Sequence, residues 1–169
     1  IHSVLPRKMI IYLYVIIIMA FTHQDTECMT LALKLSQFGR RAVGANPMVG
    51  CVITLDGKII AQDYHRLYGE GHAEVNALEQ INYKGENTKV YITLEPCSHY
   101  GKTAPCSEAL IKAGVKKVFI AMLDPNPLVS GRGIKLLQDS DIEVEVGLLE
   151  KEATEINRGF IKRMQTGLP

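Results

Sequence analysis

The chain has 169 residues, a length that suits one domain with at most a short appendage. Its formal net charge of +1 gives no bulk electrostatic case for binding nucleic acid or an anionic membrane. It has no tryptophan and few aromatic residues, so it lacks the usual stacking platforms for single-stranded nucleic acid. A hydrophobic content of 47% is typical of a globular protein and argues against disorder.

An unbroken apolar run occupies residues 9–21, directly after Arg7 and Lys8. As a helix it would span about 20 Å, which is short for a bilayer core of about 30 Å. We expect residues 1–24 to be an N-terminal extension outside the functional domain, which would cover residues 25–169. The alternatives are an element packed on the domain surface and an export signal or anchor.

The remaining sequence predicts alternating helices and strands. Apolar periodicity favours a helix over 27–38, with caps at Asp25 or Thr26 and a stop at Gly39. The pattern then predicts strand 49–55, a turn at 56–57, strand 58–64, helix 72–81, strand 89–94, helix 105–113, strand 118–122, helix 133–138, strand 142–146 and helix 149–164. A hairpin followed by alternating helices and strands predicts an α/β fold: a mixed five-stranded sheet with helices on both faces.

Three short segments combine residues that bind metals: Gly71-His72-Ala73-Glu74, Glu95-Pro96-Cys97 and Pro105-Cys106. His72 and Cys106 fall at predicted helix starts, and Cys97 follows a predicted buried strand. A helix N-terminus favours the thiolate form of cysteine, which is the form that binds metal. The other two cysteines, Cys28 and Cys51, sit in apolar patterns and are interpreted as packing residues.

One histidine and two cysteines would leave the fourth position of a tetrahedral zinc open, as in catalytic rather than structural sites. We therefore predict one Zn²⁺ per chain, bound by His72, Cys97 and Cys106. Zinc lowers the pKa of its bound water to about 7. Glu74, two residues after His72, is predicted to be the catalytic group that moves protons between that water and the leaving nitrogen.

Each residue has a plainer interpretation when taken alone. His72 could be a helix-capping or core histidine, Cys97 and Cys106 could form a disulfide or remain core thiols, and Glu74 could be a solvated helix residue. The combination resembles the zinc-deaminase signature, H-x-E followed by P-C-x-x-C. The second cysteine comes nine positions after the first, in PCSHYGKTAPC, which is a longer gap than that signature has.

A family resemblance accounts for the longer gap. HAEVNAL, YITLEPCSHYGKTAPCSEALIKAGVKKVFIAMLDPNPLVSGRG and ANPMVGCVI resemble the deaminase domain of the bifunctional riboflavin-biosynthesis deaminase–reductases, over residues 25–169. The long loop between the cysteines is a hallmark of this branch. Ala104 is a small departure, because the family more usually has proline there.

The resemblance implies a three-layer cytidine-deaminase-like fold and a cytoplasmic enzyme. It implies hydrolytic deamination of 2,5-diamino-6-(5-phosphoribosylamino)pyrimidin-4-one, with release of ammonia. NADPH is expected only for the family's C-terminal reductase domain, which would begin after Pro169 and is expected to be absent here. A small phosphorylated substrate and a homo-oligomer are the expected partners, with no nucleic acid and no membrane.

Polar residues in the predicted loops fit such a substrate. Asn46 could hydrogen-bond the ring, the loop between the cysteines offers donors for a phosphate, and two residues follow a buried strand where α/β proteins place ligand contacts. Each could instead be an ordinary polar loop residue. The candidate substrate-binding residues are Asn46, His65, Ser98, His99, Lys102, Asp124 and Asn126.

Two rival functions remain open from the sequence. One is deamination of another nucleoside, free base or tRNA base. The other is a structural zinc module, which would need a fourth protein ligand; His65 and His99 are the candidates, but they are not at ligand-like positions.

Overall fold

The structure is a computed structural model that describes residues 21–101 and 104–167. A single sheet forms its centre, with the strand order β2-β1-β3-β4-β5. The strands are β1 (Gly50–Leu55), β2 (Lys58–Tyr64), β3 (Lys89–Ile92), β4 (Lys117–Ile120) and β5 (Glu143–Val146). β1 runs antiparallel to β2 and β3, whereas β3, β4 and β5 are parallel. The predicted mixed five-stranded sheet is confirmed.

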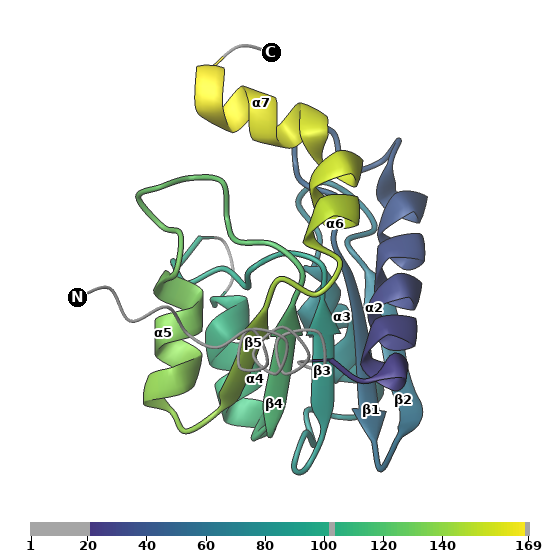
Figure 1. Cartoon of the computed structure of the whole chain (residues 1–169). Helices are drawn as coiled ribbons and strands as arrows, with labels where there is room; N and C mark the ends of the chain where they lie inside the picture. Colours follow the sequence, from purple (N-terminus) through teal and green to yellow (C-terminus); the bar gives the residue numbers. More distant parts are fainter. Residues whose placement is uncertain (1–20, 102–103, 168–169) are drawn as a thin grey trace, which may run out of the picture.

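Helices cover both faces of the sheet. They are α2 (His23–Ser36), the 3-10 helix η1 (Gln37–Gly39), α3 (Ala73–Gln80), α4 (Cys106–Ala113), α5 (Arg132–Asp139), α6 (Glu150–Ile156) and α7 (Arg158–Thr166). Figure 1 shows α2 in front of the sheet and α3 and α4 behind it, with α6 and α7 above the strands. This arrangement is the predicted three-layer architecture.

The first helix begins earlier than the sequence predicted. α2 starts at His23, ahead of both the expected start at Glu27 and the expected domain boundary at residue 25. Thr22 is the N-cap, and its hydroxyl accepts the backbone N–H of Asp25, whose carboxylate accepts the N–H of Thr22. The apolar run was expected outside the domain, and residues 1–20, which include all of that run except Phe21, lie outside the described residues.

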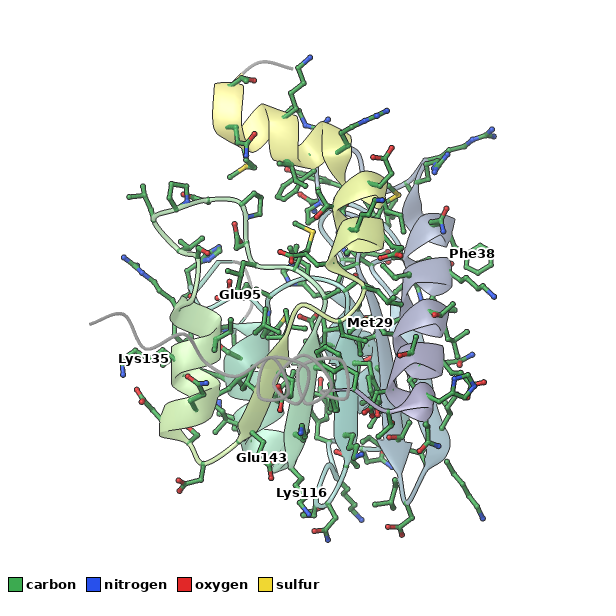
Figure 2. The ribbon with its side chains drawn as sticks, in the orientation of Figure 1. Met29, Phe38, Glu95, Lys116, Lys135 and Glu143 are labelled. Carbon is green, nitrogen blue, oxygen red and sulfur yellow. The ribbon has the colours of Figure 1, made fainter. Side chains whose placement is uncertain are left out.

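The central sheet packs closely against α2. Met29 of α2 is fully buried between the helix and the sheet, whereas Phe38 points into solvent (Figure 2). Gly50 in β1 permits this approach, because a Cβ there would lie 1.9 Å from the backbone oxygen of Ala32. The predicted packing role of Cys28 is confirmed by its burial in this core, and Cys51 is buried in the same core.

The prediction of a single last helix over residues 149–164 is wrong. Residues 149–164 form two helices, α6 and α7, which meet at Asn157. The side chain of Asn157 is buried and hydrogen-bonds the backbone of Met48, 109 residues away. This distant contact explains the break, which the local amphipathic pattern does not show. Within residues 21–101 and 104–167, no helix has the length and apolar character needed to cross a membrane.

Candidate metal centre and active site

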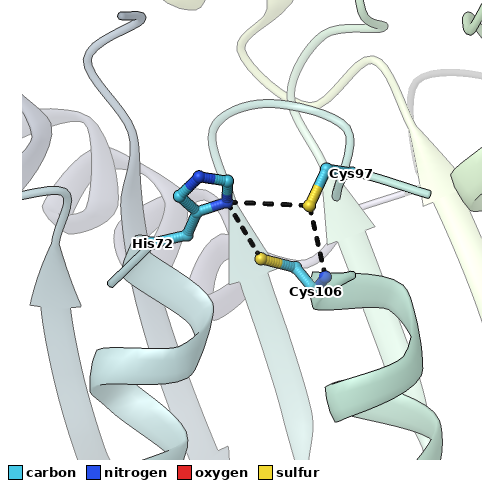
Figure 3. A group of neighbouring side chains, drawn as sticks. All are labelled: His72, Cys97 and Cys106. Atoms are coloured by element: carbon cyan, nitrogen blue, oxygen red, sulfur yellow. Dashed lines mark hydrogen bonds between the residues drawn. The ribbon is translucent and has the colours of Figure 1, made fainter. Parts of the chain in front are cut away.

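Three different elements bring the predicted ligand residues together. His72 is the N-cap of α3 and has an extended backbone, Cys106 is the first residue of α4, and Cys97 lies in the loop that follows β3. Helices α3 and α4 therefore start beside each other at the end of the sheet where the parallel strands finish. Figure 3 shows the three side chains pointing toward one another.

The donor atoms have the spacing of a metal site. His72 Nδ1 lies 3.1 Å from Cys106 Sγ and 3.6 Å from Cys97 Sγ, and the three ligand atoms all lie within 4.8 Å of one another. Ligands at about 2.0–2.3 Å from a tetrahedral zinc are about 3.3–3.8 Å apart. The 3.6 Å distance lies in that range and the 3.1 Å distance is slightly shorter, so a small outward movement of the side chains makes room for that ion. Among the described residues, this is the group of histidine, cysteine and acidic side chains that could hold a metal.

The two thiols differ in their electrostatic surroundings. Hydrogen bonds from the Cys106 thiol, the His72 ring and the Cys106 backbone N–H lower the pKa of Cys97 to about 4. The pKa of Cys106 is raised, because its thiol hydrogen-bonds Cys97 and because it is buried near Glu74. A second thiolate at this position therefore requires a nearby cation, which a divalent metal would supply.

Glu74 lies in the first turn of α3 and is almost completely buried. Burial raises the pKa of Glu74 to about 7, although the nearby His72 opposes the shift. A carboxyl group with such a pKa can both accept and donate a proton near neutral pH. Its side chain borders the same cavity as His72 and Cys97, so it is placed to act on a molecule bound beside the metal ligands.

A cavity of about 410 Å³ opens beside the metal ligands. Five of the seven candidate substrate-binding residues line it: Asn46, His65, His99, Asp124 and Asn126. Ser98 is not among its lining residues and borders a much smaller hollow next to it. Lys102 lies outside the described residues. The structure thus brings most of the predicted residues to one cavity.

Two of these residues are linked by a hydrogen bond. The His65 ring is buried, and its Nδ1 lies 3.1 Å from the carbonyl oxygen of Gly71, the residue before His72. Because a carbonyl oxygen only accepts, Nδ1 carries the proton, and Nε2 accepts from Asn46 Nδ2 at 3.0 Å. Burial lowers the pKa of His65, which favours this neutral form. The amide nitrogen of Asn46 is therefore engaged inside the protein.

The loop after β4 carries Asp124 and Asn126. Asp124 Oδ1 accepts the N–H of Asn126 at 2.8 Å, and Asn126 Oδ1 accepts the N–H of Leu128 at 3.0 Å. Burial raises the pKa of Asp124, against the effect of the Asn126 N–H. Both side chains thus shape successive turns of the loop as well as lining the cavity.

Glu95 is a buried residue whose role the sequence did not reveal. Its carboxylate accepts three backbone N–H groups, two from the loop that leads into α5 and one from the first turn of α5: Asp124 at 3.1 Å, Gly131 at 3.0 Å and Gly133 at 3.1 Å. Figure 2 labels Glu95 beside the start of α5. A Cβ on Gly133 would lie 2.2 Å from the backbone oxygen of Pro96, so α5 packs directly on the segment that carries Cys97.

Apolar residues complete the cavity, and none of them was predicted as a site residue. Phe160 and Met164 contribute from α7, one helical turn apart. Their spacing of four residues was the available signal, because it places both on one helix face. The others are Pro47, Val49, Leu94 and Val129.

Comparison with known proteins agrees with this site. The model of the family described as "Cytidine and deoxycytidylate deaminase zinc-binding region" matches residues 22–122. The diaminohydroxyphosphoribosylamino-pyrimidine deaminase of Buchnera aphidicola subsp. Schizaphis graminum is 50% identical over 146 residues, which are 86% of this chain and 99% of the relative. The riboflavin biosynthesis protein RibD of Escherichia coli is 52% identical, over 86% of this chain and 40% of its own length.

Solved structures show the same similarity. RibD of Acinetobacter baumannii superposes with a TM-score of 0.83 and 48% identity, over 86% of this chain and 41% of that chain. The chain thus spans about two fifths of these two RibD proteins and nearly all of the Buchnera deaminase. The fold, the cluster and the family match together define a zinc-binding deaminase domain. The chain belongs to the cytidine and deoxycytidylate deaminase family, in the branch of the diaminohydroxyphosphoribosylamino-pyrimidine deaminases.

Proposed function

We propose that this chain hydrolyses 2,5-diamino-6-(5-phosphoribosylamino)pyrimidin-4-one to the corresponding 5-aminouracil derivative and ammonia. The observation that carries the proposal is the cluster of His72, Cys97 and Cys106, of which His72 and Cys97 line the same cavity as the buried Glu74. The name of the Buchnera relative, which aligns along almost its whole length, supports this choice of substrate class.

His72, Cys97 and Cys106 would hold one zinc ion per chain. When bound, zinc supplies Lewis acidity that makes water nucleophilic at neutral pH. Water then adds its oxygen to the ring carbon that bears the 2-amino group, and the bond from that carbon to the amino nitrogen breaks. Glu74 moves both protons of the water: one goes to the ring nitrogen beside that carbon, and the other goes to the departing amino nitrogen, which leaves as ammonia while the oxygen becomes the carbonyl of the uracil.

The remaining cavity residues would bind and orient the ring. His65 holds the amide nitrogen of Asn46, so the amide oxygen of Asn46 is the atom left to accept from a ring amino group. His99, Asp124 and Asn126 line the cavity and offer further polar contacts. Phe160 and Met164 supply an apolar wall against which a flat ring can pack.

We assign the phosphate to the loop between the two cysteines. A second hollow of about 410 Å³ lies on this side of the metal ligands, and His99, Gly101 and Ala104 are among its lining residues. Lys102 falls between Gly101 and Ala104 in the sequence, and Ser98 starts the same loop. A lysine there would give a charge-assisted contact with a phosphate.

The proposed site of the reaction is the cytoplasm. All four cysteines are free thiols, and a metal site of two cysteines needs them reduced. A homo-oligomer stays a prediction.

Ammonia release tests the proposal. The assay compares the phosphorylated diaminopyrimidinone with cytidine and deoxycytidylate, before and after removal of metal with a chelator and after zinc is restored. We expect ammonia mainly from the diaminopyrimidinone, loss of activity on chelation and recovery with zinc. Release of ammonia from cytidine or deoxycytidylate alone would contradict the substrate, and zinc binding without any deamination would favour a structural module.

A further inference from the structure

The junction between α6 and α7 is tied to a distant loop. Asn157, between the two helices, has only 2% of its surface exposed. Its Oδ1 accepts the backbone N–H of Met48 at 2.8 Å, and its Nδ2 donates to the backbone carbonyl of the same residue at 2.9 Å. One side chain therefore satisfies both polar groups of one peptide residue, which fixes that residue at two points.

Met48 belongs to the segment that carries Asn46. This segment connects η1 to β1, and Asn46 and Pro47 both line the cavity beside the metal ligands. Arg163 of α7 donates from Nη2 to the backbone carbonyl of Ala45 at 3.1 Å. The α6–α7 pair thus holds the backbone on both sides of Asn46, at Ala45 and at Met48.

Helix α7 of this pair also forms one wall of the cavity. Phe160 and Met164 lie on α7 and line the cavity. Figure 1 shows α7 above the ends of the strands. Both helices follow residue 122, where the match to the family model ends. The wall and the Asn46 segment are therefore held by a part of the chain that the shared deaminase pattern does not include.

We propose that Asn157 is a positioning residue for substrate binding. Its two hydrogen bonds to Met48, called the clamp below, hold the Asn46 segment beside the cavity and fix its position relative to Phe160 and Met164 of α7. This inference rests on the proposed function for its substrate, but the clamp itself can be tested without any reaction. Asn157 does not line the cavity and acts only through the residues it holds.

Two variants test the clamp. Asn157→Leu is similar in size and removes both hydrogen bonds, whereas Asn157→Asp keeps the acceptor for the Met48 N–H but places an oxygen against the Met48 carbonyl. Thr88→Val is the matched control: Thr88 is equally buried, and its hydroxyl donates to the Gly85 carbonyl at the opposite end of the sheet. If Asn157→Leu does not fold, Asn157→Asp and the surface variant Arg163→Met carry the test.

The rate of hydrogen exchange at the Met48 amide measures directly whether its N–H is held by Asn157. In Asn157→Leu we expect exchange at Met48 to be at least about tenfold faster, with zinc content unchanged, since both hydrogen bonds to Met48 are lost. The KM for the phosphorylated diaminopyrimidinone should rise about tenfold while kcat changes less than about threefold. Thr88→Val should leave both quantities unchanged.

The outcomes separate this inference from the proposed function. Unchanged exchange at Met48 in Asn157→Leu would overturn the clamp, whatever the enzyme's substrate. Faster exchange with an unchanged KM would overturn the positioning role and leave the proposed function intact. A wild-type chain that releases no ammonia would refute the proposed function, while the exchange result would still decide whether Asn157 holds the Asn46 segment.

Discussion

Glu95 gives the sharpest stability prediction, through the substitution Glu95→Gln. The carboxylate accepts two N–H groups at Oε2, from Asp124 and Gly131, and one at Oε1, from Gly133. A glutamine in the same rotamer can place its oxygen at the Oε2 position and keep the first two bonds. Its NH₂ group then faces the Gly133 N–H, so two donors meet and the third bond is lost.

The expected cost follows from that geometry. A hydrogen bond to a charged group contributes about 1.5–3 kcal/mol, and the two retained bonds weaken because their acceptor is no longer charged. We therefore expect Glu95→Gln to lower the free energy of unfolding by about 2–3 kcal/mol, measured by urea denaturation. Glu95→Ala should lose more, since all three donors are then left without this acceptor.

The control is Glu86→Gln, which makes the same chemical change on an exposed side chain. It should alter the free energy of unfolding by less than about 0.5 kcal/mol. If Glu95→Gln is as stable as the wild type, the loop from Asp124 to Gly133 does not depend on this carboxylate, and the reasoning is refuted.

Three further predictions concern the site and its surroundings. Glu74→Gln should keep its zinc and its fold but lose about 10²–10⁴-fold in kcat, because the amide cannot carry a proton; near-normal turnover would remove Glu74 from the mechanism. Lys102→Ala should raise KM for the phosphorylated substrate far more than for its dephosphorylated analogue, and the difference should correspond to about 1.5–3 kcal/mol of binding free energy. An equal rise in KM for both substrates would place Lys102 away from the phosphate. Burial alone would raise the pKa of Asp63, but hydrogen bonds from Arg66 and from the Tyr64 N–H outweigh it and hold the pKa below the ordinary 3.8. The ionised Asp63 therefore stabilises the fold above the ordinary pKa, and this stabilisation is lost as the pH falls through the lower pKa of the folded state. The free energy of unfolding, measured from pH 6 to pH 3, should therefore fall less steeply in Asp63→Asn than in the wild type. Parallel curves for the two proteins would contradict this.

The metal ligands were predictable from the sequence because their environment is local. A histidine and a cysteine at helix starts and a cysteine after a buried strand meet wherever consecutive α/β units pack side by side. His72, Cys97 and Cys106 converge for this reason, and the strands and helices that support them follow one another along the chain as predicted. The early start of α2 could also have been predicted from the sequence, since Thr22 and Asp25 have the spacing of a capping box.

The rest of the site depends on contacts between distant parts of the chain. Nothing local to Asn157 shows that its amide will bind Met48, and so the break between α6 and α7 was missed. Glu95 stands in the motif before Cys97, but its three partners lie 29 to 38 residues further on. Phe160 belongs to an ordinary amphipathic pattern, and only the packing of α7 turns it toward the cavity.

The most direct test of the account is X-ray absorption at the zinc edge, made on active protein of known metal content. We expect one zinc per chain, with two sulfur ligands at about 2.3 Å and lighter ligands at about 2.0–2.1 Å that include one imidazole and one non-protein oxygen. That result would match His72, Cys97 and Cys106 with one position left for water. Active protein without zinc, a disulfide between Cys97 and Cys106, or a fourth protein ligand closing the site would contradict the central claim.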